Sequence, residues 1–209
     1  MKRYTRRALL GATAGTLFVT AGCAGLNIGG SSSVPFDQQF IDMMVPHHQG
    51  AVEMAKIAQQ RGEHAEVKKM AQDVITSQSS EIEKMTSWRK QWFGSDKTPP
   101  MNKMPMVEGS QMAAAGSGGM GGMNHSGSAA ATTMDMSADV EKLRKAPEPF
   151  DRAFIDAMIP HHESAIDAAK AAETRAQRPE IKQLAKEVIA AQQKEIEQMK
   201  GWRKAWFNA

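Results

Sequence analysis

The sequence has only one cysteine, so no disulfide can form within the chain. It also lacks a lasting surplus of positive charge. The formal charge is +3, but residues 1–22 hold four basic and no acidic groups, and removing those four charges leaves −1. Binding to nucleic acid needs a basic patch, so no nucleic-acid partner is expected.

The first 22 residues resemble an export signal. Residues 2–7 are rich in Lys and Arg, and the apolar run over 8–19 is too short to span a bilayer. The motif "TRRALLG" resembles a twin-arginine signal, which directs the export of a folded chain. The sequence therefore predicts an exported protein that faces the periplasm or the outside of the cell.

Cys23 follows the letters "TAG", as the cysteine of a bacterial lipobox does. Thr20 stands where such motifs usually have Leu or Val. We expect Cys23 to be lipidated and to anchor the chain to the membrane through a tether over residues 23–35. The alternative is cleavage after Ala21, which would leave a free thiol.

An internal repeat organises the rest of the chain. Residues 36–93 and 150–207 align without a gap, and about half of their positions are identical. Each copy holds two stretches of helical periodicity joined by a short turn, "RGEH" in one and "RAQR" in the other. Asp37 and Asp151 are expected to cap the first helix of each copy. Two such hairpins predict an all-α four-helix bundle.

Residues 94–149 differ from both repeats. Gly, Ser, Ala and Pro dominate, no aromatic residue occurs, and we expect the segment to be a disordered linker. It nevertheless holds half of the chain's 16 methionines. Low-complexity drift could produce this enrichment, or the thioethers could serve as soft metal ligands. The residues concerned are Met101, Met104, Met106, Met112, Met120, Met123, Met134 and Met136, with His125 beside them.

Two adjacent histidines follow a proline in the first helix of each repeat, in "VPHHQG" and "IPHHES". With 3.6 residues per turn, both rings flank the apolar face that points into the bundle. If the first hairpin turns near residue 63, His48 lies at the height of Gln78 on the second helix. Imidazole and thioether groups should therefore converge inside each hairpin. The expected metal ligands are Met44, His47, His48 and Met85 in the first repeat, and Met158, His161, His162 and Met199 in the second.

Other residues near these faces are weaker candidates. Gln and Glu interrupt the apolar row of each second helix, one Met lacks a counterpart, and one Asp per repeat faces away in ideal geometry. These residues are Gln78, Glu81, Gln192, Glu195, Met54, Asp42 and Asp156. The alternative is that the histidines are core residues bonded to a neighbouring Gln or Glu, with the methionines as gap-filling core.

A mixture of imidazole and thioether without thiolate favours copper, as Cu(I) or Cu(II), in an oxidising compartment. Zinc is an alternative through His47, His48 and Glu81, but it would leave the methionine enrichment unexplained. Di-iron bundles need inward Glu-x-x-His motifs, and neither repeat contains one.

The stretch "FDQQFIDMMVPHHQGAVEMA", its second copy and the later "EIEKM" and "EIEQM" motifs closely resemble the family catalogued as domain of unknown function 305. The resemblance covers both repeats and not the linker. It implies a ferritin-like helical fold, and some members resemble periplasmic copper-binding proteins that contribute to copper tolerance. By position, it points to the same Met and His residues as ligands. It implies no settled enzymatic activity.

The sequence therefore predicts a copper buffer or chaperone rather than an enzyme. Its partners would be metal ions and the membrane, with a second copy of the chain or another copper-handling protein as further candidates. Two alternatives stay open, a metal oxidase on the same scaffold and a metal-free interaction module. The latter would dock through the aromatic residues that end the hairpins, Trp88, Trp92, Phe93, Trp202, Trp206 and Phe207.

Overall fold

A computed structural model describes residues 34–107 and 133–208 of the chain. The expected export signal, Cys23 and most of its tether lie outside the described residues. So do four residues singled out in the linker, which are Met112, Met120, Met123 and His125. The fold is therefore described for both repeats and for the parts of the linker next to them.

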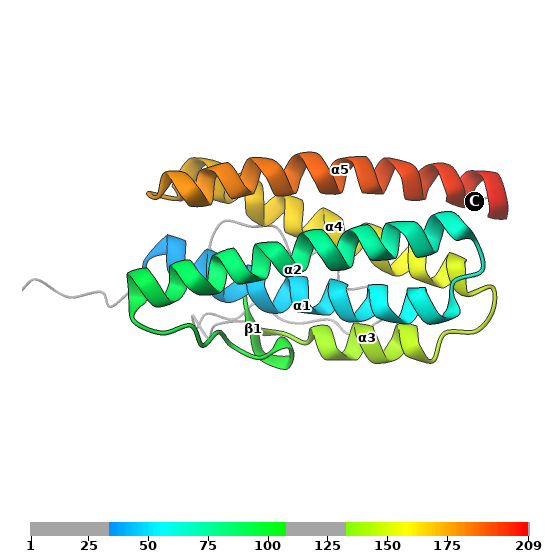
Figure 1. Ribbon diagram of the computed structural model, residues 1–209, viewed down its shortest axis with the longest axis horizontal. Coiled ribbons are helices and arrows are strands. Elements are labelled where there is room, and N and C mark those ends of the chain that lie inside the picture. Colours follow the sequence, from blue (N-terminus) through cyan, green and yellow to red (C-terminus); the bar gives the residue numbers. More distant parts are fainter. Residues whose placement is uncertain (1–33, 108–132, 209) are drawn as a thin grey trace, which may run out of the picture. The chain divides into compact units, whose positions relative to one another are not determined.

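Two helical hairpins build the core. In the first, α1 (Phe36–Arg61) turns back into α2 (Ala65–Phe93), and in the second, α4 (Phe150–Arg175) turns back into α5 (Pro179–Phe207). The hairpins pack against each other through α1 and α4 (Figure 1). The expected all-α four-helix bundle is confirmed, and each helix buries the apolar stripe that its periodicity predicts. Among the described helices, none is long and apolar enough to cross a membrane.

Both central helices run through an internal proline, Pro46 in α1 and Pro160 in α4. Proline has no N–H to donate and crowds the carbonyl four residues before it, which costs about 3 kcal/mol in a helix interior. Neither helix ends there, and the histidines follow directly. Burial of the apolar residues around each proline offsets this cost.

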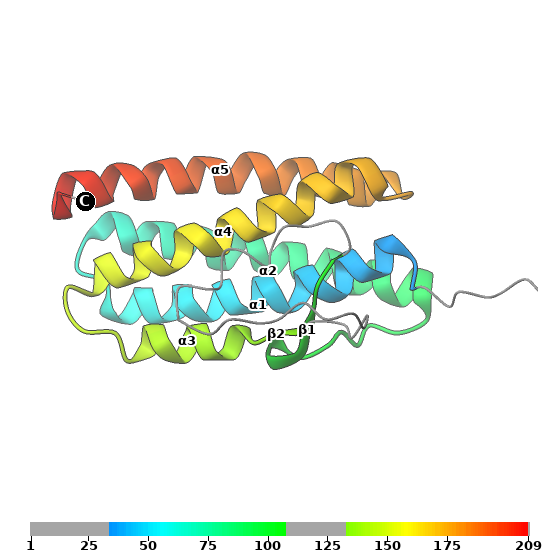
Figure 2. The ribbon, with the colours of Figure 1, turned by 180° about the vertical axis from the view of Figure 1, so that it is seen from behind.

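Part of the expected linker has regular structure, which corrects the expectation of disorder over residues 94–149. A short helix, η1 (Met101–Lys103), leads into strand β1 (Met104–Pro105), which pairs antiparallel with β2 (Thr133–Met134). Helix α3 (Met136–Arg144) follows and lies along α1 (Figure 2).

Local chemistry explains why α3 forms. The Asp135 carboxylate caps it by accepting hydrogen bonds from two backbone N–H groups of the first turn. Met136, Val140 and Leu143 fall on one face of the helix, and all three are buried. The composition of residues 94–149 as a whole does not indicate this short apolar face, so the sequence analysis did not predict α3.

The two hairpins exchange capping carboxylates. Asp37 and Asp151 do not cap their own helices, contrary to expectation, because α1 and α4 have no side-chain cap. Asp37 instead accepts from the two backbone N–H groups just before α5. Asp151 accepts from the N–H groups of Glu63 and His64 before α2, at 2.9 and 2.8 Å. Each aspartate therefore caps the second helix of the opposite repeat, because those N–H groups lie nearest in three dimensions.

The aromatic residues at the hairpin ends also pack between the repeats. The Trp206 ring stacks on the His64 ring, with centroids 3.8 Å apart and planes inclined by 4°. At the equivalent position of the other repeat, the Arg178 guanidinium lies 4.1 Å from the Trp92 ring centroid. These side chains close the ends of the core, so the structure gives them a packing role.

Candidate metal centre

Four buried imidazoles meet where α1 packs on α4. His47, His48 and His162 have no exposed surface, and His161 is 6% exposed. The rings of His47 and His161, one from each repeat, have centroids 3.8 Å apart. Each of these two rings lies 6.2 Å from the ring of its neighbour in the sequence. The two Pro-His-His motifs therefore form one cluster in the middle of the bundle.

A carboxylate from the second helix of each hairpin holds one ring of each pair. Glu81 Oε2 lies 2.6 Å from His48 Nε2, and Glu195 Oε2 lies 2.6 Å from His162 Nε2. A carboxylate only accepts, so each Nε2 donates its hydrogen. The Nδ1 atoms of these two rings are buried and have no hydrogen-bond partner. In a neutral ring, such an Nδ1 carries a lone pair that can bind a metal ion.

Ser164 orients a third ring in the same way. Its hydroxyl has one hydrogen, which it donates to the His161 carbonyl over 2.7 Å. The hydroxyl oxygen must therefore accept from His47 Nε2, which lies 2.8 Å away. His47 Nδ1 is again buried without a partner. In these three rings Nε2 is hydrogen-bonded and Nδ1 has no partner. A hydrogen bond on the nitrogen that does not bind the ion is common in metal-binding histidines.

The fourth ring, that of His161, differs because no side chain bonds to either of its nitrogens, and its polar contact is with the His47 backbone. Gly50 occupies the position in the first repeat that Ser164 occupies in the second, and it has no hydroxyl to offer. A Cβ built at Gly50 would lie 3.6 Å from His161 Nε2. The glycine therefore offers the His161 ring no side-chain partner.

Burial keeps two of the rings neutral. Desolvation lowers the pKa of His47 well below its usual value, and the nearby imidazoles of His48 and His162 lower it further. Burial and the other three imidazoles lower the pKa of His161 in the same way, and the backbone of His47 opposes this only weakly. Neutral imidazole is the form that binds metals, so no proton has to leave these rings first.

The predicted sulfur ligands lie one helical turn from the residues of the two His–Glu hydrogen bonds. Met44 precedes His48 by one turn of α1, and Met85 follows Glu81 by one turn of α2. In an antiparallel pair of helices, both methionines therefore lie toward the same end, and both are fully buried in one apolar cluster. The equivalent residues of the second repeat, which share the other cluster, are Met158 and Met199.

Three of the weaker candidates are buried as well. Gln78 and Gln192 are each 3% exposed, and the Oε1 atom of each lacks a hydrogen-bond partner. Met54 is 1% exposed and shares a cavity with His161. Amide oxygens and a thioether thus lie within the same core as the imidazoles.

The two weaker aspartate candidates bind arginines instead. Arg89 Nε donates to Asp42 Oδ1 over 2.5 Å, and Arg203 Nε donates to Asp156 Oδ1 over 2.6 Å. Each ion pair joins the first and second helices of its own hairpin. Neither aspartate contributes to the histidine cluster, so the structure does not support them as ligands.

Imidazoles and carboxylates alone do not complete a metal site here. In the part of the chain that the structure describes, no three or more His, Cys, Asp or Glu side chains are arranged to hold an ion. An ion bound in this cluster must therefore also use thioethers or amide oxygens, or draw the rings together. Thioethers prefer soft ions, so the donor set fits a soft ion better than a hard one.

Two residues of this centre, Ser164 and Gly50, escaped the sequence analysis. Helical periodicity places residues within one hairpin, and it does not predict contacts between the two repeats. One signal was present, namely the difference between "HHQG" and "HHES" at otherwise matching positions.

The family model for the domain of unknown function DUF305 matches residues 37–203. This chain belongs to the DUF305 family. The match includes both repeats and the segment between them, and it confirms the family that the two Pro-His-His motifs indicated.

Solved structures of similar proteins agree with this fold. CopM in its Cu(I)-bound form is 37% identical to this DUF305 chain, with a TM-score of 0.60, and the alignment covers 82% of this chain and 97% of CopM. CopM has also been solved with Cu(II) and with silver. The DUF305 protein of Streptomyces coelicolor is 25% identical, with a TM-score of 0.56 and coverage of 79% and 90%.

Among curated proteins, an uncharacterized protein of Acanthamoeba polyphaga mimivirus is 45% identical over 49 residues. The match takes in 23% of this chain and 32% of that protein. This chain therefore spans about a third of the length of the curated relative that it matches.

Proposed function

We propose that this DUF305 protein binds copper in the centre of its bundle and serves outside the cytoplasm as a copper buffer or chaperone. One observation carries the proposal: the buried Nδ1 atoms of His47, His48 and His162 have no partner, while Nε2 of each ring is held. A buried polar atom without a partner costs about 1–3 kcal/mol. Metal ions bound at these rings, with thioethers or amide oxygens as further ligands, would provide the missing partners.

Copper fits the available donors better than zinc does. Imidazole binds both metals, but thioether selects soft ions and above all Cu(I). Four methionines are fully buried. Met44 and Met158 lie one turn from His48 and His162, and Met85 and Met199 lie one turn from the glutamates that bond to those rings. The Cu(I), Cu(II) and silver forms of CopM, a protein of the same fold, support copper as the cargo here.

Metal titration tests this proposal. The purified protein should bind Cu(I) in competition with a chelator of known affinity, and the double variant His48→Gln, His162→Gln should lose most of that binding. His64→Gln is the matched control, because His64 lies at the hairpin end against Trp206. Equal copper affinity in the double variant and the control would contradict the proposal. Metal analysis after native purification separates copper from zinc.

Binding rather than turnover is the proposed role. An oxidase would need an open coordination position and access for oxygen. The four rings are at most 6% exposed, which favours storage or transfer of an ion over catalysis on it. Oxygen consumption with Cu(I) as substrate should stay at the background rate. A rate that rises in proportion to the protein concentration would favour the oxidase.

We also propose that the protein is exported and anchored to the membrane through a lipid on Cys23, because the residues around it resemble a lipobox. The natural protein should then partition into the detergent phase of a phase-separating detergent. Cys23→Ala should move to the aqueous phase. An unchanged distribution would contradict the anchor without affecting the copper proposal.

A further inference from the structure

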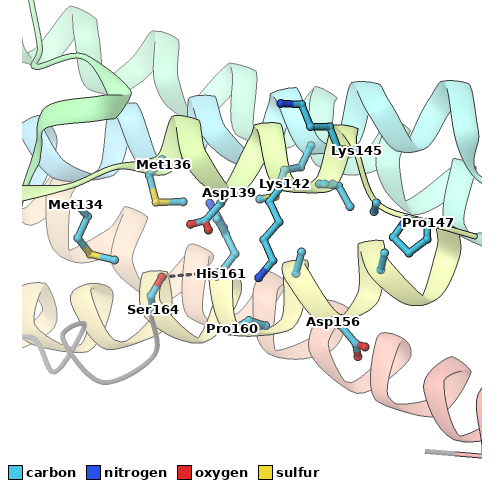
Figure 3. A pocket seen from close by; sticks show the side chains of 15 residues that line it. Met134, Met136, Asp139, Lys142, Lys145, Pro147, Asp156, Pro160, His161 and Ser164 are labelled. Atoms are coloured by element: carbon cyan, nitrogen blue, oxygen red, sulfur yellow. Dashed lines mark hydrogen bonds between the residues drawn. The ribbon is translucent and has the colours of Figure 1, made fainter. Parts of the chain in front are cut away.

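A pocket of about 940 Å³ opens beside the histidine cluster, between α3 and α4 (Figure 3). Met134 and Met136 line it from the β2–α3 segment, Met54 lines it from α1, and His161 reaches it from α4. Met54 and Met136 are 1% and 4% exposed. Three thioethers and one imidazole therefore share a single cavity.

The imidazole in this pocket is free to accept a ligand. His161 is 6% exposed, and no side chain bonds to either of its ring nitrogens. Its polar contact is with the His47 backbone. A Cβ built at Gly50 would lie 3.6 Å from His161 Nε2 and 3.6 Å from the Met136 Cε methyl carbon. The nitrogen and the thioether thus border the same small space in front of Gly50.

The same space is closed around the equivalent histidine of the first repeat. There the Ser164 hydroxyl takes up His47 Nε2 at 2.8 Å. Gly50 stands at the corresponding position opposite His161 and offers no such group. A side chain therefore bonds to the His47 ring, whereas none bonds to the His161 ring.

The repeats also differ at two further positions near the pocket. Ala157 lines the pocket, whereas its equivalent, Met43, is fully buried. Met54 places a thioether in the pocket, whereas its equivalent is Ala168. Each side thus has one Met and one Ala at these positions, and only on the pocket side does the Met line a cavity that His161 also lines.

We propose that His161 Nε2 and the sulfurs of Met54 and Met136 form a second site for a soft monovalent cation such as Cu(I), with Met134 at its mouth. This site, here called the α3 site, rests on the proposed function for the identity of its cargo. Thioether and imidazole donors are neutral and polarisable, which suits a soft ion of low charge. The charged groups that line the pocket balance, with Asp139 and Asp156 opposite Lys142 and Lys145, so the neutral donors determine which ion the site prefers.

The α3 site would also give the buried centre a path to solvent. The His161 ring contacts the His47 ring, which has no exposed surface. A metal site in a protein interior needs such a path if the ion is to reach it. An ion held at the α3 site would be one imidazole away from the central cluster.

Methyl NMR with Ag(I) as the probe tests the α3 site apart from the centre. The protein carries ¹³C-labelled methionine methyl groups and the His48→Gln, His162→Gln substitutions, which disable the centre. One equivalent of Ag(I) should shift the methyl signals of Met54 and Met136. Met70, a buried methionine of α2 that does not line the pocket, should stay in place. Unmoved signals of Met54 and Met136 would overturn the α3 site, whatever copper affinity the natural protein shows.

Gly50→Ser in the same background gives a second test, because it copies the hydroxyl of Ser164. The new Cβ would meet its nearest neighbours at 3.5 to 3.6 Å, which is ordinary contact, so the fold should be retained. The hydroxyl should engage His161 Nε2 and weaken Ag(I) binding about tenfold. Gly50→Ala fills the same volume without a hydroxyl and should weaken binding less. Unchanged Ag(I) affinity in Gly50→Ser would overturn the assignment of His161 Nε2.

Discussion

At the scale of single residues, the histidines can be both hydrogen-bonded core residues and metal ligands, although the sequence presents these roles as alternatives. His48 and His162 are bonded to glutamates, as the alternative of ordinary core residues expects. The same bonds occupy only Nε2 and leave Nδ1 buried and unpartnered. Such a bond orients a ring and raises its basicity as a metal ligand. The hydrogen bond to the glutamate is therefore compatible with metal binding through Nδ1.

Removing the carboxylates that orient the rings should weaken copper binding. The double variant Glu81→Gln, Glu195→Gln keeps the side-chain size but loses both charges. Loss of such orienting groups typically lowers metal affinity 10- to 100-fold, so we expect a loss of about that size. Chelator competition with Cu(I) measures it. Glu83→Gln on the exposed face of α2 is the control, and equal affinity in all three proteins would contradict the role of the carboxylates.

The lowered pKa values of His47 and His161 predict that the metal-free protein loses stability in acid. Below about pH 6.5 the unfolded chain protonates these rings, while the folded chain keeps them neutral until the pH is much lower. The unfolded state then binds more protons, so the free energy of unfolding falls by up to about 1.4 kcal/mol per pH unit for each ring.

Urea unfolding measured from about pH 7.5 down to about pH 5.5 checks this dependence. The variant His161→Gln should show a shallower decline than the natural chain, because one of the two rings is gone. A free energy of unfolding that stays constant across this range would show that both rings can be protonated within the fold.

At the scale of elements, periodicity predicted the four long helices because each buries one continuous stripe. It failed for α3, where three buried side chains lie within a segment dominated by small residues. It also failed for Asp37 and Asp151, because a carboxylate bonds to the nearest free N–H regardless of distance along the sequence. Local patterns determined the helices, whereas contacts between helices depended on the packing of the two repeats.

The exchanged caps should contribute to the stability of the bundle. Asp151 has no exposed surface and accepts from two backbone N–H groups and from the His64 ring. Asp151→Ala would remove the acceptor of three part-buried hydrogen bonds, and we expect it to lower the free energy of unfolding by about 1–2 kcal/mol. Urea unfolding measures the loss. Asp73→Ala, at an exposed ion pair on α2, should change it by about 0.5 kcal/mol or less, and equal effects of the two would contradict the capping role.

At the scale of the whole molecule, the centre exists only because the two repeats face each other. His47 and His161 come from different hairpins, and Ser164 of one repeat binds His47 of the other. Helical periodicity predicts that the rings lie on the inner face of each hairpin, but it does not predict the contacts of His47 with His161 and Ser164. The differences between the repeats, such as Gly50 opposite Ser164, make two sides of a duplicated fold chemically distinct.

A metal held between the hairpins should stabilise the whole fold. An ion that binds only the folded chain adds about 2.7 kcal/mol of stability when its free concentration is 100 times its dissociation constant. Thermal unfolding followed by circular dichroism should therefore shift upward with Ag(I) in the natural protein. In the His48→Gln, His162→Gln variant the shift should be smaller. The same shift in both proteins would place the stabilising ion elsewhere.

The tautomers of the buried rings, followed by ¹⁵N NMR with and without Ag(I), test the central claim most directly. In the metal-free protein, His47, His48 and His162 should carry hydrogen on Nε2, as their hydrogen bonds require, and the account predicts a bare Nδ1 on each ring. Addition of Ag(I) should then shift the Nδ1 resonances of these rings while Nε2 remains protonated. If the metal leaves all three Nδ1 resonances unchanged, the buried histidines are core residues and the account of a metal centre is wrong.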